Sequence, residues 1–275
     1  MINLAKRKNG WTEGKIAKYI AEGRGQGELA GYKPWLTIQD VPSHGRVHRL
    51  KGWKTQRIHQ FMSDLECNYF YLLEWAENVI DIREQFPLDR ERTTKIAEER
   101  DINHPIDKET KTPIVMTTDF IITIREKDKV KYLARTIKMS KELEHRRTIE
   151  KFEIERHYWE EQNIDWGIVT ELDIPKIISK NILWVHGDFY INEKELELIN
   201  VLYEELGASE STLLDVVTVF DEKYLLEKGT GLTLFKYLLA RKYITIDMNN
   251  NFDVQVSVTD LNFDKEFCEN KENVV

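Results

Sequence analysis

Cysteine is scarce in this sequence. The 275 residues contain two cysteines, Cys67 and Cys268, and no Cys-x-x-Cys pair. We therefore expect neither a disulfide framework nor a cysteine-based zinc site, and a reducing cytoplasm is the favoured compartment.

Long apolar runs are missing too. No segment approaches the ~20 apolar residues that cross a bilayer. The N-terminal stretch MINLAKRKNGW carries basic residues with no apolar segment behind them. We expect no membrane span and no signal peptide. The hydrophobic fraction of 41% and the aromatic fraction of 11% are sufficient for a packed core, so global disorder is not expected.

Several catalytic signatures are also absent. There is no G-x-S-x-G elbow, and no H-E-x-x-H arrangement surrounds His44 and His48, which are interpreted as polar loop residues. The glycines of EGRGQG (22–27) follow no obvious strand and precede no Walker lysine, so they indicate a basic, flexible loop rather than a nucleotide site.

Charge is unevenly distributed along the chain. The net charge is −8, yet residues 1–60 hold 12 Lys/Arg and 4 Asp/Glu, while residues 61–275 hold 28 and 44. A basic arm on an acidic body is compatible with phosphate contacts. An ordinary solvated surface is the alternative. The candidate DNA-binding residues are Arg24, Lys33, Arg46, Arg49, Lys54 and Arg57.

Hydrophobic periodicity divides the chain into two parts. Helices are predicted over 11–24, 63–79 and 141–163, strands over 79–88 and 165–171, a short helix and loop over 89–113, and a two-stranded hairpin over 116–140. This order predicts an α/β domain with a mixed sheet over residues 1–171.

Residues 172–275 have a different pattern. Three amphipathic helices are predicted over 193–206, 211–225 and 230–242, followed by two alternating strands over 243–258 that an Asn-rich turn joins. This is the element order of a winged-helix domain. Because the region is acidic overall, we favour protein binding over DNA binding for it.

The hairpin carries residues that suit a magnesium-dependent nuclease. Asp119 lies on its first strand and Lys138 lies near the end of its second, where Thr136 replaces the acid usual two residues before the lysine. Glu66 lies on the apolar face of the preceding helix, with Phe70 and Leu73. Magnesium prefers oxygen ligands, and a lysine can stabilise developing negative charge. A surface hairpin, and a glutamate paired with an arginine, explain the same residues without catalysis.

The chain resembles the TnsA family, the endonuclease subunits of TnsA–TnsB transposases. The segments that carry the resemblance are EGRGQG (22–27), PWLTIQDVPSHGRVHR (34–49), SDLE (63–66), DIREQFPL (81–88), HP (104–105), TTDF (117–120), IK (137–138) and TIEKFEIERHYW (148–159). They span most of residues 20–170. Beyond residue 172, element order rather than motif carries the resemblance.

The resemblance implies a restriction-endonuclease-like catalytic domain, over residues 1–171, that nicks double-stranded DNA at the 5′ ends of the transposon. Glu66, Asp119 and Lys138 match the family's catalytic positions, and Thr136 stands where a family member has glutamine. Glu66 and Asp119 would hold one or two Mg²⁺ ions, or Mn²⁺ in their place, with the backbone carbonyl of Ile137 as a further ligand.

The resemblance also implies partners. A TnsB-type transposase would process the 3′ ends, and a winged-helix-like C-terminal domain, residues 172–275, would contact a TnsC-type ATP-dependent regulator. Two other functions remain open from the residues: a catalytically silent adaptor that binds DNA and protein, and a stand-alone restriction or repair nuclease.

Overall fold

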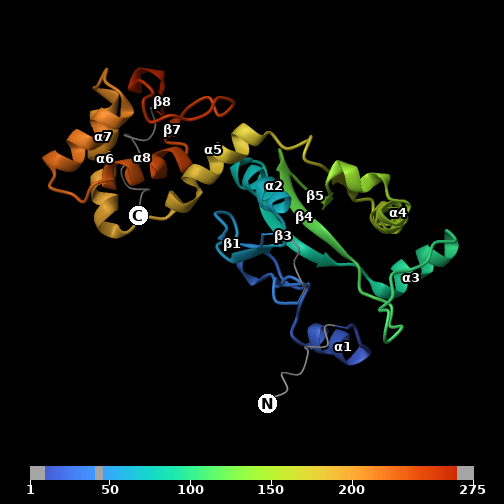
Figure 1. The fold of residues 1–275 in the computed structure, drawn as a ribbon. Helices are drawn as coiled ribbons and strands as arrows, with labels where there is room; N and C mark the ends of the chain where they lie inside the picture. Colours follow the sequence, from blue (N-terminus) through green and yellow to red (C-terminus); the bar gives the residue numbers. More distant parts are fainter. Residues whose placement is uncertain (1–9, 41–45, 265–275) are drawn as a thin grey trace, which may run out of the picture. The chain divides into compact units, whose positions relative to one another are not determined.

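The computed structural model describes residues 10–40 and 46–264 and separates the chain into two compact units, Met1–Ile174 and Pro175–Val275 (Figure 1). The sequence predicted a boundary after residue 171. His44 and Cys268, which entered the predictions above, lie outside the described residues. Among the described residues, no helix has the length and apolarity needed to span a membrane.

A four-stranded mixed sheet forms the centre of the first unit. Its strands are β3 (Val79–Pro87), β4 (Thr117–Glu126), β5 (Lys129–Ile137) and β6 (Asp165–Val169), in spatial order β3-β4-β5-β6. The first two pairings are antiparallel and the last is parallel. The prediction of a mixed sheet is thereby confirmed.

Helices α3 (Arg90–Glu99) and α4 (Arg146–Glu161) cover one face of this sheet (Figure 1). The cross-strand partners Ile121 and Ala134 belong to one buried cluster with Ile96 of α3 and Ile154 of α4. Burial of this apolar surface supplies the main driving force for the layer. The predicted helices over 89–113 and 141–163 are confirmed, with the 3₁₀ turn η2 (Ser140–Glu144) preceding α4.

The opposite face carries α2 (Asp64–Trp75) and an antiparallel pair, β1 (His48–Lys51) and β2 (Ile58–Phe61). The ring of Phe120 on β4 lies 5.8 Å from that of Phe61 and 5.6 Å from that of Tyr69 on α2, centre to centre. The β1–β2 pair was not predicted, because its strands are only four residues long and include three basic or polar positions in β1.

Residues 10–40 form the N-terminal segment of the same unit. Helix α1 (Glu13–Ala21) begins at Thr12, whose hydroxyl accepts the amide of Lys15, and the 3₁₀ turn η1 is Leu29–Gly31. Trp35 is buried and packs beside Tyr19 of α1, with ring centres 5.3 Å apart. Its backbone N–H donates to the carbonyl of Gln85, which fastens the segment to β3.

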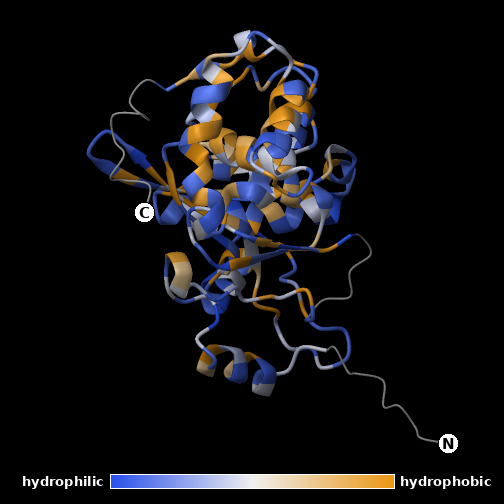
Figure 2. Ribbon diagram, turned by 90° about the vertical axis from the view of Figure 1, so that its left-hand side faces the viewer, coloured by the Kyte–Doolittle hydropathy of each residue, from blue (hydrophilic) through white to orange (hydrophobic). Residues whose placement is uncertain are grey.

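The second unit is helical. Its helices are α5 (Lys176–His186), α6 (Glu193–Gly207), α7 (Leu213–Lys223) and α8 (Thr230–Ala240), with the short 3₁₀ turns η3 (Gly187–Phe189) and η4 (Val258–Asp260). Figure 2 shows orange apolar residues and blue hydrophilic residues on opposite sides of these helices. The three predicted helices are confirmed, and α5 was not predicted.

The predicted hairpin over 243–258 is wrong. The strands of this unit are two residues long, β7 (Ile244–Thr245) and β8 (Asn262–Phe263), and they pair with each other. The Asn-rich segment instead packs on α5, where the side-chain amide of Asn181 donates to the carbonyls of Met248 and Asn250. These polar contacts replace the strand pairing that alternation alone suggested, so residues 243–258, all of which the structure describes, do not form the predicted two-stranded wing.

Candidate active site

Glu66 lies at the start of α2, where helix capping holds its carboxylate. The Ser63 hydroxyl accepts the Glu66 amide at 3.1 Å and donates to Oε1 of Glu66 at 2.8 Å. The amide of Met62 donates to Oε2 at 3.1 Å. Because a helix leaves its first N–H groups without intrahelical partners, a glutamate at this third position closes a reciprocal cap. The carboxylate is therefore fixed in a largely buried place, with 9% of the residue exposed.

Asp119 lies near the beginning of β4, where β4 and β5 stop pairing. Regular pairing reaches Phe120 and Arg135. Beyond it, the amide of Ile137 donates to Oδ2 of Asp119 at 2.7 Å, and the side-chain amide of Gln85 on β3 donates to Oδ1 at 3.1 Å. The carboxylate thus takes the place of a backbone acceptor and is held from both neighbouring strands.

These two carboxylates influence each other. Burial raises the pKa of Glu66 to about 7, and the negative charge of Asp119 contributes to that increase. Burial also raises the pKa of Asp119 to about 6, although Ile137, Gln85 and the positive charge of Lys138 oppose the rise. Two like charges in a desolvated place disfavour ionisation of both groups. A cation bound between them would remove that penalty.

Lys138 follows β5 directly and is half-buried. Its amide donates to the carbonyl of Val169 on β6 at 2.9 Å, so the parallel pairing of β5 with β6 fixes its backbone. Its charge acts on Asp119, which places Lys138 beside the acidic pair. The structure therefore brings together Glu66, Asp119 and Lys138, the three residues that the sequence predicted as a catalytic group.

Thr136 is buried and its hydroxyl is used within the protein. The hydroxyl donates to Oε1 of Glu155 at 2.5 Å and accepts the indole N–H of Trp166 at 3.2 Å. The Thr118 hydroxyl donates to the same oxygen of Glu155 at 2.6 Å. Thr136 therefore contacts a carboxylate of α4 and does not point at Asp119 as a free ligand. Ile137 contacts Asp119 through its amide N–H.

Sequence reasoning missed Glu155 and Gln85. Glu155 is buried, and burial raises its pKa to about 7, with the charge of Asp119 adding to the effect. It follows Phe152 by three positions and precedes Trp159 by four, so the helical spacing that identified Glu66 also identifies Glu155. Gln85 carries no such signal, because its role depends on a backbone conformation that spacing does not reveal.

The donors fit a hard divalent cation that keeps part of its water shell. Among the described residues, no group of three or more His, Cys, Asp or Glu side chains is close enough to hold a metal ion. Glu66 and Asp119 supply two carboxylates in mutual electrostatic contact. Magnesium is commonly held by one or two carboxylates together with waters, so two are sufficient.

Three of the predicted DNA-binding residues are engaged inside the protein. Arg57 forms a buried ion pair with Glu84, and Arg24 binds Asp40 at 2.6 Å and covers the Tyr19 ring. The ammonium of Lys54 donates to the carbonyl of Ala76 at 2.7 Å.

These contacts hold the β1–β2 pair and the N-terminal segment in place. Because Arg24 and Arg57 already neutralise carboxylates inside the protein, we withdraw these two from the DNA-binding set, whereas Lys54, which donates to a backbone carbonyl, stays a prediction.

The other three remain accessible. Arg46 and Arg49 are exposed; Arg46 lies two residues before β1, and Arg49 lies within it. The ammonium of Lys33 donates to the carbonyl of Glu22 at an exposed site. His48 lies between the arginines in sequence and bonds Oδ1 of Asp64 at 2.7 Å, so it packs against the start of α2 rather than forming a histidine site of its own.

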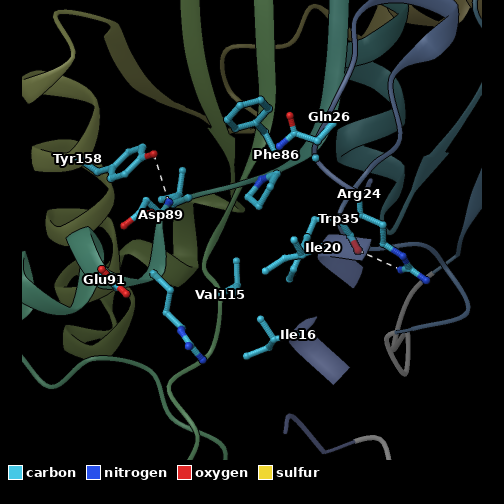
Figure 3. Close-up of a pocket in the computed structure, with 14 residues that line it drawn as sticks. Ile16, Ile20, Arg24, Gln26, Trp35, Phe86, Asp89, Glu91, Val115 and Tyr158 are labelled. Carbon is cyan, nitrogen blue, oxygen red and sulfur yellow. Dashed lines mark hydrogen bonds between the residues drawn. The ribbon is translucent and has the colours of Figure 1, made fainter. Parts of the chain in front are cut away.

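A cavity of about 610 Å³ lies between α1 and the segment that joins β3 to α3 (Figure 3). Ile16 and Ile20 point into it from α1, with Trp35 beside them, and Phe86 borders it on the other side. Glu66, Asp119 and Lys138 do not line it. The acidic group therefore lies outside this cavity.

Known proteins resemble this chain over most of its length. Residues 76–171 match the model of the TnsA-like endonuclease N-terminal domain, and residues 173–248 match that of the TnsA endonuclease C-terminal domain. The transposon Tn7 transposition protein TnsA of Escherichia coli is 37% identical over 255 residues, covering 90% of this chain and 91% of that protein.

The chain belongs to the TnsA family. Because the family is one of endonucleases, membership makes the chain a nuclease.

Proposed function

We propose that the chain is the Mg²⁺-dependent endonuclease subunit of a cut-and-paste transposase. It hydrolyses the phosphodiester at the 5′ ends of the transposon, on the strand that is not transferred, and it acts with a TnsB-type partner. The observation that carries this proposal is the pair of carboxylates, Glu66 and Asp119. The charge of Asp119 contributes to the raised pKa of Glu66, and the charge of Lys138 acts on Asp119.

Glu66 and Asp119 hold the metal in this proposal. A bound Mg²⁺ or Mn²⁺ would neutralise the scissile phosphate and acidify the attacking water. Met62 and Ser63 hold the Glu66 carboxylate, and Gln85 and Ile137 hold that of Asp119. The carbonyl of Ile137 is a further candidate ligand.

Lys138 stabilises negative charge as it develops on the phosphate and orients the attacking water. Thr136 has a supporting role. Its hydroxyl donates to Glu155, and the charge of Asp119 contributes to the raised pKa of Glu155, so Thr136 is linked to the metal site through the carboxylate of Glu155.

The element order α2-β3-α3-β4-β5-α4-β6 supports a restriction-endonuclease-like catalytic unit. In the second unit, α6, α7 and α8 with the short β7–β8 pair form a reduced winged-helix-like domain. We assign to this domain the contact with a TnsC-type ATP-dependent regulator. Lys33, Arg46 and Arg49 contact DNA phosphates, since they are basic and accessible on the first unit.

Strand-specific cleavage mapping on transposon-end DNA tests the proposal. With Mg²⁺ and the partner transposase, we expect nicks at the 5′ ends from the unaltered protein and none from Asp119→Ala or Lys138→Ala. Asp128→Ala and Lys129→Ala are matched controls, because they lie exposed at the opposite end of the same hairpin. Both controls should cleave normally.

Three results would change the assignment. Normal nicking by Asp119→Ala would remove the proposed site. Absence of cleavage by the unaltered protein under every metal and partner condition would favour a silent adaptor. Equal cleavage with and without the partner would favour a stand-alone nuclease.

A further inference from the structure

Gln85 has an unusual backbone conformation for a strand residue. Its φ is +50°, and it is the one residue of a described β-strand, glycine aside, with a φ in the left-handed region. It is also buried, with 4% of the residue exposed. Left-handed φ values are unfavourable for residues with a Cβ and persist where surrounding contacts enforce them, often at functional sites.

At Gln85 the regular alternation of side chains between the two faces of the sheet is interrupted in β3. Residues two apart in a strand normally share a face. Here Glu84 bonds His59 of β2 at 2.8 Å, whereas the ring of Phe86 lies 5.9 Å from that of Trp159 on α4. These partners belong to opposite faces of the sheet. Gln85 is the residue at which the alternation changes.

Three hydrogen bonds hold Gln85 in this conformation. Its carbonyl accepts the Trp35 amide at 3.1 Å, and Oε1 accepts the Thr117 hydroxyl at 3.2 Å. Nε2 donates to Oδ1 of Asp119 at 3.1 Å. Because an ionised carboxylate only accepts, the nitrogen end of the amide must face Asp119.

Glycine would adopt this backbone without strain. A glutamine at this position therefore carries a backbone strain that glycine would not. The strain indicates that the glutamine side chain has a role of its own. The amide is the only side-chain donor to Asp119 among the described hydrogen bonds, and it leaves further lone pairs of both carboxylate oxygens available.

We infer that Gln85 is a positioning residue that sets the orientation of Asp119 for metal binding, held in its strained conformation by Trp35 and Thr117. The inference rests on the proposed function, since it assigns a task at the same metal site. Removal of a hydrogen-bond partner behind a metal ligand commonly lowers metal affinity or activity about 10- to 100-fold, and we expect a loss of that size.

Gln85→Gly is the decisive variant, because it relieves the backbone strain and removes the amide together. We expect its thermal midpoint to equal or exceed that of the unaltered protein. Its affinity for Mn²⁺, measured by calorimetry without DNA, should fall about 10-fold or more, and the Mg²⁺ concentration for half-maximal cleavage should rise in parallel. A residue that only shapes the fold would lower stability and activity together.

Two further variants complete the experiment. Gln56→Gly is the matched control: Gln56 has a φ of +56° and is exposed in the β1–β2 turn. It should gain similar stability with unchanged Mn²⁺ affinity and cleavage. Gln85→Glu keeps the shape and replaces the donor with a negative oxygen facing Asp119. Its cleavage should fall further than that of Gln85→Gly at the same Mg²⁺ concentration.

The outcomes are separable. Mn²⁺ affinity and cleavage of Gln85→Gly within twofold of the unaltered protein would overturn the inference, and so would a loss of cleavage with unchanged Mn²⁺ affinity. Asp119→Asn is tested in parallel. Cleavage by Asp119→Asn would overturn the proposed function itself, whereas an inactive Asp119→Asn beside a normal Gln85→Gly would overturn the role of Gln85 alone.

Discussion

Buried carboxylates occur in two contrasting places of the first unit. Glu84 receives two N–H groups of Arg57 and one ring nitrogen of His59, and it is 1% exposed. The His59 and Arg57 charges and hydrogen bonds outweigh its burial, so the pKa of Glu84 is lowered to about 2. Glu66 and Asp119 have neutral hydrogen-bond donors and each other as neighbours, and their pKa values are raised.

The difference separates a structural acid, Glu84, from the two acids that we propose to bind a metal. The cation that neutralises Glu84 belongs to the protein, so the group stabilises the fold in every condition near neutral pH. The positive charge of Lys138 acts on Asp119, whereas the charges that raise the pKa of Glu66 are the negative ones of Asp119 and Glu84. A buried charge without compensation is unfavourable, and in the proposed function a divalent cation would supply the compensation.

The largest expected effect comes from Glu84→Gln. Removing one member of a buried ion pair leaves the other charge uncompensated and typically costs about 3–5 kcal/mol. Asp119→Asn should instead leave the free energy of unfolding unchanged or increase it in metal-free buffer, because it removes one of two repelling charges. Urea unfolding of both variants at neutral pH measures the contrast. Equal destabilisation would show that Asp119 is a structural acid too.

Stability should depend on pH in opposite directions for the two places. The folded protein binds protons more tightly at Glu66 and Asp119 than the unfolded chain does, whose reference pKa values are 4.5 and 3.8. The thermal midpoint without metal should therefore rise as the pH falls from about 7 towards 4.5.

Below that range, the contribution of Glu84 is lost as the pH falls from about 4.5 towards 2. Asp119→Asn should show a smaller rise between pH 7 and 4.5, and differential scanning calorimetry over this range gives the comparison. A midpoint that falls steadily from pH 7 would contradict the raised pKa values.

Thr136→Val should have an intermediate effect. It keeps the volume but removes the hydroxyl that donates to Glu155, and loss of a partner for a buried polar group costs about 1–3 kcal/mol. Thr136→Ser keeps the hydroxyl and serves as the control. We expect cleavage by Thr136→Ala to exceed that of Asp119→Ala, because the threonine acts through Glu155. A loss as complete as that of Asp119→Ala would make Thr136 a principal ligand.

The smallest effect on stability is expected from Arg49→Ala. An exposed substitution typically changes stability by less than about 0.5 kcal/mol. Affinity for DNA should fall, and the dependence of binding on salt should weaken by about one ion. Arg57→Ala should lower stability strongly, because it removes the cation that pairs with Glu84, and it should change DNA affinity little. Binding isotherms at several salt concentrations, with unfolding curves, distinguish the two arginines.

Much of the catalytic unit could be predicted from the sequence. Helical spacing placed Glu66 on an inward face, and strand alternation brought Asp119 near Lys138, because both rest on local periodicity. The accessibility of arginines could not be predicted: Arg49 and Arg57 look alike in sequence, and the partner of Arg57 lies 27 positions away on β3.

The conformation of Gln85 could not be predicted from the sequence either, because contacts from Trp35 and Thr117, which are distant in the sequence, impose it. In the second unit, alternation over 243–258 suggested strands, but Asn181 binds that segment and overrides the local preference.

The effect of Mg²⁺ on the thermal midpoint without DNA tests the central claim most directly. If Glu66 and Asp119 form a metal site, Mg²⁺ raises the midpoint of the unaltered protein, because a ligand that binds only the folded state stabilises it. The thermal midpoint of Asp119→Asn should not rise with Mg²⁺. That of Glu84→Gln should be lower without Mg²⁺ than in the unaltered protein, and it should still rise when Mg²⁺ is added. An equal increase in the unaltered protein and in Asp119→Asn would contradict the account.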